Sequence, residues 1–97
     1  MEQMSFTYPA RVRLERRVHV GVVGSGDLEV LLEPSPDGQA HVSVSTSVDG
    51  FGAVWKNVLD RFFSRFEGAA RIEINDFGAT PGVVMLRLEQ AAERLRA

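Results

Sequence analysis

Residues 18–32 read VHVGVVGSGDLEVLL, in which two runs of alternating apolar residues flank a glycine-rich segment. Alternation with a period of two is typical of β-strands that bury one face. In the symmetric register, the opposing apolar residues are Val22 with Leu28, Val20 with Val30, and Val18 with Leu32. This register puts all of them on one face, so the sequence predicts a β-hairpin with Ser25 at the centre of its loop.

The predicted loop, Val23-Gly24-Ser25-Gly26-Asp27, is rich in turn-forming residues. Because glycines flank Ser25 on both sides, we expect its hydroxyl to be exposed and unshielded. The spacing of Gly21, Gly24 and Gly26 is the reverse of the dinucleotide-binding fingerprint, and no helix follows it. A nucleophile elbow is excluded as well, because its glycines stand two residues before and after the serine.

Outward from the hairpin, the chain alternates between predicted strands, turns and helices. The expected elements are a half-buried strand at 11–15, a turn at 34–38, a strand at 41–47, a helix between residues 49 and 68, a strand at 70–74 and a helix from residue 80. Gly68 would end the first helix, and Thr80 and Pro81 are a good N-cap and first-turn pair for the second. We expect an α+β two-layer sandwich, in which both helices pack on one face of an antiparallel sheet of about four or more strands, and not a helical bundle.

Both predicted helices are amphipathic. The apolar residues of the first are Phe51, Val54, Trp55, Val58, Leu59, Phe62, Phe63 and Phe66. Those of the second are Val84, Leu88, Ala91 and Leu95. Its solvent-facing side, the wet side of the helix, is formed by Arg87, Glu89, Glu93, Arg94 and Arg96. We interpret the aromatic stripe as core and not as a ligand-binding surface, with Phe51 and Phe63 at edges that could reach a partner.

The composition limits the classes of function. A chain of 97 residues has the length of one small domain, spanning residues 1–97. With 44% hydrophobic and 25% charged residues it is typical of a soluble globular protein, and its net charge of -2 gives no support for nucleic-acid binding. It has no cysteine, no secretory signal and no apolar stretch near the roughly 20 residues of a membrane span. We therefore expect a cytoplasmic protein without a membrane partner.

Few residues could support catalysis. His19 and His41 are the groups able to act as a base near neutral pH without a large pKa shift, and both occupy polar positions of predicted strands. Asp27, Asp49 and Asp76 lie in predicted turns, where aspartate has local hydrogen-bonding roles. No metal-ligand spacing is present, so we assign no catalytic or metal-binding residue and do not expect an autonomous enzyme.

A basic cluster lies early in the chain and consists of Arg11, Arg13, Arg16 and Arg17. Two interpretations stay open at this point. The cluster is a solvated strand face with Glu15 as a partial partner, or it meets a phosphate-rich group or an acidic partner surface.

Three strings carry a resemblance to a known family. They are VVGSGDLEVL (residues 22–31), TSVDG (residues 46–50) and DFGATPGVV (residues 76–84). In order and spacing they resemble the acyl carrier (delta) subunit of biotin-independent malonate decarboxylase. Pattern alone would make Ser25 an ordinary hairpin serine. The resemblance implies that Ser25 carries 2'-(5''-phosphoribosyl)-3'-dephospho-coenzyme A through a phosphodiester, with Gly24, Gly26 and Asp27 as the neighbours of the attachment point.

The resemblance also implies a non-catalytic carrier that holds acetyl and malonyl thioesters on the prosthetic thiol. The implied partners are an acyl transferase subunit, decarboxylase subunits and a prosthetic-group transferase. Gly24 and Gly26 would let the attaching enzyme and the nucleotide come close to the backbone, and Asp27 would orient the Ser25 hydroxyl or cap the turn. The chain has no cysteine, so a thioester must form on a prosthetic thiol.

Two other functions stay open. The acyl carrier subunit of citrate lyase uses the same type of prosthetic group, although its attachment serine lies in a context without the VVGSGDLEV string. An unmodified interaction module, whose glycine-rich hairpin docks into a partner, would need no prosthetic group at all.

Overall fold

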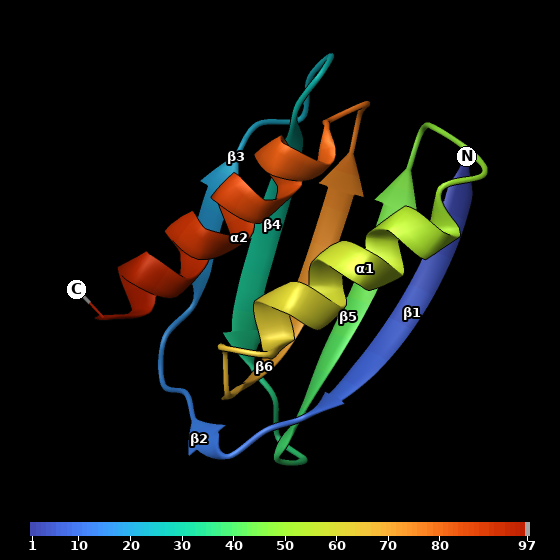
Figure 1. The fold of residues 1–97 in the computed structure, drawn as a ribbon. Helices are drawn as coiled ribbons and strands as arrows, with labels where there is room; N and C mark the ends of the chain where they lie inside the picture. Colours follow the sequence, from blue (N-terminus) through green and yellow to red (C-terminus); the bar gives the residue numbers. More distant parts are fainter. Residues whose placement is uncertain (97) are drawn as a thin grey trace.

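A computed structural model describes residues 1–96, which form a mixed sheet covered on one face by two helices (Figure 1). The strands are β1 (Glu2–Pro9), β2 (Val12–Arg13), β3 (Val18–Gly21), β4 (Leu28–Pro34), β5 (Gln39–Thr46) and β6 (Gly68–Asp76), and the helices are α1 (Gly52–Phe63) and α2 (Pro81–Arg96). The strand order is β1-β5-β6-β4-β3, and β2 pairs with β6 off this path. The predicted α+β two-layer class is confirmed.

The sheet is mixed, whereas an antiparallel sheet was expected. β1 is antiparallel to β5, and β4 is antiparallel to both β3 and β6. β5 and β6 are parallel, because the chain crosses over through α1 between them and returns in the same direction. Residue alternation identifies a strand but not the neighbour it joins, so this detail of the prediction is wrong.

The central hairpin forms in the predicted register for two of its three apolar pairs, Val18 with Leu32 and Val20 with Val30. The third pair does not form, because β3 ends at Gly21 and Val22 is 62% exposed. Gly21 has a φ of +84°, and a Cβ placed on it would lie 2.1 Å from the carbonyl oxygen of Leu28. Only glycine satisfies both conditions, so the chain leaves the sheet one residue earlier than the valine pattern predicts.

The N-terminal region differs most from the prediction. β1 was not predicted, although every second side chain along it is half-buried. Three of these, Met4, Phe6 and Tyr8, pack against the hydrophobic core. The half-buried strand expected at 11–15 is reduced to the two exposed residues of β2. β2 lies at the lower end of the sheet, beyond both helices (Figure 1), so Val12 has no layer above it to bury it.

α1 is shorter than predicted. It ends at Phe63, and the next residue, Ser64, donates its backbone N–H to the carbonyl oxygen of Asp60. Phe66 lies outside the helix but still stacks on Phe62, with ring centroids 4.9 Å apart. Gly68 begins β6, and a Cβ placed on it would lie 2.6 Å from the Phe66 ring. This glycine permits close packing and does not end a helix.

α2 begins at Pro81 as predicted, and the Thr80 hydroxyl oxygen accepts the backbone N–H of Val83 at 3.3 Å. Its predicted inward residues are buried or half-buried, namely Val84, Leu88, Ala91 and Leu95. Arg87 was expected on the wet side, but its side chain is only 26% exposed and forms an ion pair with Asp27.

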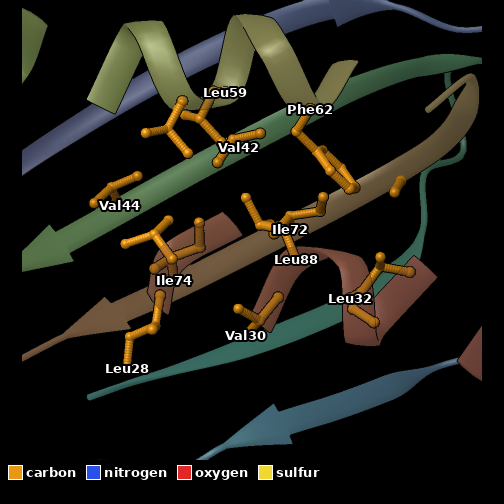
Figure 2. Packing of buried hydrophobic residues seen from close by; sticks show 14 of the residues in the cluster. Leu28, Val30, Leu32, Val42, Val44, Leu59, Phe62, Ile72, Ile74 and Leu88 are labelled. Carbon is orange, nitrogen blue, oxygen red and sulfur yellow. The ribbon is translucent and has the colours of Figure 1, made fainter. Parts of the chain in front are cut away.

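The hydrophobic core lies between the sheet and the two helices (Figure 2). Ile72 and Ile74 of the central strand β6 are fully buried at its middle. Neighbouring strands and both helices contribute the surrounding buried side chains Leu28, Val30, Leu32, Val42, Val44, Leu59, Phe62 and Leu88. The aromatic stripe is therefore mainly core, as predicted, and Phe51 lies exposed at its edge.

Leu88→Ala and Leu86→Ala test which face of α2 stabilises the fold. The two substitutions change helix propensity equally, but Leu88 is fully buried and Leu86 is 51% exposed. We expect Leu88→Ala to lower the free energy of unfolding by about 2–5 kcal/mol and Leu86→Ala to lower it by less than about 1 kcal/mol. Urea denaturation measures both, and equal losses would contradict this packing.

Candidate functional site

Ser25 is exposed in the connection between β3 and β4, which we call the serine loop (residues 22–27). The backbone N–H of Asp27 donates to the carbonyl oxygen of Gly24 at 3.0 Å, closing a four-residue turn with Ser25 and Gly26 at its centre. Gly26 has a φ of +77° and Ser25 has no positive φ, which is the pattern of a type II turn. The predicted hairpin therefore presents the Ser25 side chain at the tip of a well-defined turn.

The two glycines beside Ser25 have different roles. Gly26 is required by its positive φ. Gly24 has no such requirement, because its φ lies outside the left-handed region. A Cβ built on either glycine would have nothing within 4 Å. There is consequently open space beside the backbone on both sides of Ser25.

The base of the serine loop is held against the connection between β6 and α2 (residues 77–80). The backbone N–H of Gly26 donates to the carbonyl oxygen of Phe77 at 2.7 Å, and the N–H of Phe77 donates to the carbonyl oxygen of Asp27 at 2.9 Å. The antiparallel ladder of β4 and β6 ends with Leu28 opposite Asp76. These two bonds extend the pairing into the loop with a one-residue bulge, because Gly26 and Asp27 both lie opposite Phe77.

An ion pair with α2 provides a second anchor. The Arg87 guanidinium donates from Nε to Asp27 Oδ1 at 3.1 Å and from Nη2 to Asp27 Oδ2 at 2.7 Å, which is a bidentate arrangement. The backbone N–H of Leu28 also donates to Asp27 Oδ1, at 2.7 Å. Hydrogen bonds from Arg87 and then Leu28 hold the pKa of Asp27 below its usual value, and the same pair raises the pKa of Arg87. Both Asp27 oxygens are thus engaged, which favours the anchoring role over orientation of the Ser25 hydroxyl.

Asp76 organises the connection on which the serine loop rests. It is 4% exposed and accepts a hydrogen bond from the Thr46 hydroxyl at 2.8 Å. It also accepts the backbone N–H groups of Gly78 at 3.3 Å and Ala79 at 3.0 Å. The local turn role expected for this aspartate is present, but its bond to the distant Thr46 was not predicted.

Sequence reasoning missed Arg87 as a residue of this site. Its position in α2, three residues after the buried Val84, indicated only a polar helix surface. The available signal was its charge, opposite to that of Asp27 in the glycine-rich loop. That signal is weak, because the two residues are 60 positions apart.

The basic cluster lies far from Ser25. β2, which contains Arg13, is at the lower end of the sheet, and the serine loop is at the upper end (Figure 1). Arg17 lies 3.6 Å from Glu33 and Arg13 lies 3.9 Å from Glu15, both as exposed pairs. This placement favours the solvated-face interpretation over contact with a group on Ser25.

The two histidines also stay apart from Ser25 in their contacts. His19 lies 3.2 Å from Glu29, and His41 lies 2.6 Å from Asp37. Within residues 1–96, there is no group of three or more His, Cys, Asp or Glu side chains placed to hold a metal ion. No helix in this part of the chain is both long enough and apolar enough to cross a membrane.

The structure thus presents a serine on an anchored, glycine-flanked turn at the edge of a two-layer α+β domain. The family model described as "Malonate decarboxylase delta subunit (MdcD)" matches residues 15–95. The chain belongs to this family.

Curated relatives agree over nearly the whole chain. A protein of Azotobacter vinelandii named "Malonate decarboxylase acyl carrier protein" is 52% identical over 96 residues, covering 98% of this chain and 97% of the relative. A protein of the same name from Pseudomonas aeruginosa is 52% identical over 94 residues, covering 96% and 95%. A chain in the "Crystal structure of a Pseudomonas malonate decarboxylase hetero-tetramer in complex with malonate" superposes with a TM-score of 0.93 at 50% identity, covering 98% of this chain and 99% of that one.

Gly26→Ala and Gly24→Ala separate the two glycine roles. Alanine at a positive φ costs about 1–2 kcal/mol, so we expect Gly26→Ala to lower the free energy of unfolding or to free the turn from Phe77. Gly24→Ala should change stability by no more than about 0.5 kcal/mol. Urea denaturation and amide hydrogen exchange at residues 24–27 measure these effects. If both variants behave alike, the turn geometry described above is wrong.

Arg87→Gln should raise the pKa of Asp27 towards the ordinary aspartate value of about 3.9, because its main hydrogen-bonding partner is lost. The folded-state pKa of Asp27 lies below the unfolded value. The stability from this pair is therefore present above the unfolded pKa and is lost as the pH falls through the folded pKa.

Carboxyl NMR titration of Asp27 measures the change. Arg96→Gln is the matched control, since Arg96 is on the same helix and pairs with Glu93. An unchanged Asp27 titration in Arg87→Gln would show that the pair does not form in solution.

Proposed function

We propose that this chain is the acyl carrier subunit of a malonate decarboxylase and that Ser25 is the attachment point of its prosthetic group. Family membership makes it a carrier subunit and not a catalytic one. The observation that supports the attachment point is the turn itself. Ser25 is exposed at its tip, its base is bonded to Phe77 and Arg87, and a Cβ on either flanking glycine would meet nothing within 4 Å.

The proposed group is 2'-(5''-phosphoribosyl)-3'-dephospho-coenzyme A, joined through a phosphodiester to the Ser25 hydroxyl oxygen. When bound, this group supplies a thiol that carries the acyl group as a thioester. The chain has no cysteine and cannot supply such a thiol from its own side chains. The open space beside Gly24 and Gly26 supports a close approach of the nucleotide, and of the enzyme that attaches it, to the backbone.

The chain's own residues would fix the root of the arm and leave the rest mobile. The hydrogen bonds of Gly26 and Asp27 to Phe77 hold the loop base in place. Arg87, the cation at this base, is already paired with Asp27 and is not available to bind the phosphates of the arm. A tethered group of this kind reaches successive sites at high effective concentration without leaving the complex.

The proposed partners are the other subunits of the complex. The structural relative is part of a malonate decarboxylase hetero-tetramer, and we propose that this chain likewise assembles with acyl transferase and decarboxylase subunits and is loaded by a prosthetic-group transferase. We further propose that residues 1–97 act as one acyl carrier domain in the cytoplasm. A protein without cysteine is suited to a reducing compartment.

Two alternative functions were left open by the sequence, a citrate lyase acyl carrier and an unmodified interaction module. The relatives named above are malonate decarboxylase carriers, which favours malonate decarboxylase over citrate lyase. An unmodified interaction module would use the same loop surface without an arm. Intact mass distinguishes it from a carrier.

Ser25→Ala tests the proposal by intact-mass measurement. Co-expressed with a prosthetic-group synthase and transferase, the wild-type chain should gain one adduct of the phosphoribosyl-dephospho-coenzyme A type, and Ser25→Ala should gain none. Ser47→Ala is the matched control, an exposed serine in the connection between β5 and α1, and it should still gain the adduct.

Ser25→Ala should keep its free energy of unfolding within about 0.5 kcal/mol of wild type, as expected for an exposed residue outside caps and core. Loss of the adduct then reflects loss of the hydroxyl and not loss of the fold. An unmodified wild-type mass, or an adduct that persists in Ser25→Ala, would overturn the proposal.

A further inference from the structure

An apolar pocket of about 240 Å³ opens between the N-terminal ends of α1 and α2. Its walls include Trp55 and Val58 from α1 and Val84 from α2, with Ala79 on one side and Phe51 on the rim. Both helix N-termini and the serine loop lie at the same, upper end of the molecule (Figure 1). The carrier function itself does not explain why apolar side chains line a hollow at this end.

The wall of the pocket closest to the serine loop is the connection between β6 and α2. Gly78 lines the pocket, and a Cβ built on it would lie 3.9 Å from the backbone nitrogen of Gly26. The preceding residue, Phe77, accepts the hydrogen bond of the same Gly26 nitrogen. Ser25 is therefore adjacent in sequence to the residue that touches the pocket wall. A long, flexible arm attached at Ser25 can double back over this connection and bring its thiol end to the pocket.

The size of the pocket suits a small apolar group. An apolar cavity of roughly 150 Å³ is sufficient to admit benzene, and this pocket is larger. An acetyl thioester and the methylene groups next to its sulfur have comparable bulk. Burial of such methyl and methylene groups is favourable by about 0.8 kcal/mol for each one removed from water.

The charge inside the pocket distinguishes between acyl groups. Asp76 lies in its wall, and its carboxylate already accepts the Thr46 hydroxyl and two backbone N–H groups. Among the described residues, no Lys, Arg or His lines the pocket. A second carboxylate entering here would lose its water and meet a like charge without a compensating cation. An uncharged acyl group has neither cost.

We infer that this pocket shelters the acetyl thioester of the arm and rejects the malonyl thioester. The inference rests on the proposed function, since it requires an arm on Ser25. The two loaded states of the carrier then differ in exposure. The acetyl end is withdrawn from water between encounters with partners, and the malonyl end stays outside and accessible.

The N-termini of α1 and α2 at this end act in the opposite direction to the Asp76 charge. Each carries a partial positive charge of roughly half an elementary charge, which favours anions. The Asp76 carboxylate in the wall offsets these two partial charges and already accepts the N–H groups of Gly78 and Ala79 just before α2. The desolvation cost of a carboxylate between apolar walls is therefore the deciding contribution. The balance excludes malonyl and retains acetyl.

Fluorescence of Trp55 tests the inference directly. It is the single tryptophan of the chain and is 6% exposed in the pocket wall. The chain with its arm attached is compared as the free thiol, the acetyl thioester and the malonyl thioester. We expect the Trp55 emission to shift on acetylation and to remain at the free-thiol position on malonylation. No shift on acetylation, or an equal shift with malonyl, would overturn the inference.

Ala79→Phe should abolish the acetylation-dependent shift, because the added ring fills the pocket. Ala53→Phe is the matched control, since Ala53 is exposed on α1 and does not line the pocket, and it should keep the shift. Circular dichroism and mass gain at Ser25 establish that both variants fold and are loaded. An acetylation-dependent shift that persists in Ala79→Phe would contradict the assignment.

Thioester reactivity in the wild-type chain gives a second measurement that needs no variant. Reactivity towards hydroxylamine scales with the fraction of arm outside the pocket, so the acetyl carrier should react at least about threefold more slowly than free acetyl-coenzyme A. The malonyl carrier should react as fast as free malonyl-coenzyme A. The inference would be overturned if the acetyl carrier reacted as fast as free acetyl-coenzyme A, just as the malonyl carrier is expected to match free malonyl-coenzyme A. Lack of a mass gain would overturn the proposed function, whereas a mass gain with unchanged fluorescence and reactivity would overturn only the pocket.

Discussion

Backbone pairing between β4 and β6 joins the hydrophobic core to the serine loop. It runs from Pro34 opposite Ala70 to Leu28 opposite Asp76, and its middle buries the side chains of Ile72 and Ile74 completely. The same ladder continues through Phe77 into the base of the loop. The position of Ser25 is thus tied to the most buried strand of the sheet, and any movement of β6 against β4 would displace it.

The proposed attachment at Ser25 requires a fixed root, and the contacts that would supply it lie within a few residues. The turn closed by Asp27 and the bidentate Asp27–Arg87 pair restrain the loop base from the sheet and from α2. Ser25 itself is exposed, and a Cβ built on either neighbouring glycine would meet nothing within 4 Å. The charge of Arg87 is satisfied within the protein by Asp27.

Much of the fold could be predicted from local pattern. The alternation of Val18 and Val20 with polar residues, matched by Val30 and Leu32, was enough to predict the hairpin register. The Thr80–Pro81 pair predicted the start of α2. The two failures have different causes. At Gly21, the close approach of the Leu28 carbonyl requires glycine and a positive φ, which the valine pattern does not reveal. The parallel pairing of β5 with β6 follows from the crossover through α1, a property of the assembled sheet.

For the site, residue pattern and resemblance placed Ser25 in an exposed turn between two glycines, because turn chemistry and apolar alternation act over a few neighbouring residues. The contacts that hold this turn lie beyond that range. Asp27 meets Arg87 across 60 positions and Thr46 meets Asp76 across 30, and the apolar pocket forms where the ends of two helices come together over the sheet. Such partners are selected by packing, which brings distant segments together through buried area and charge, and no single segment of the sequence encodes them.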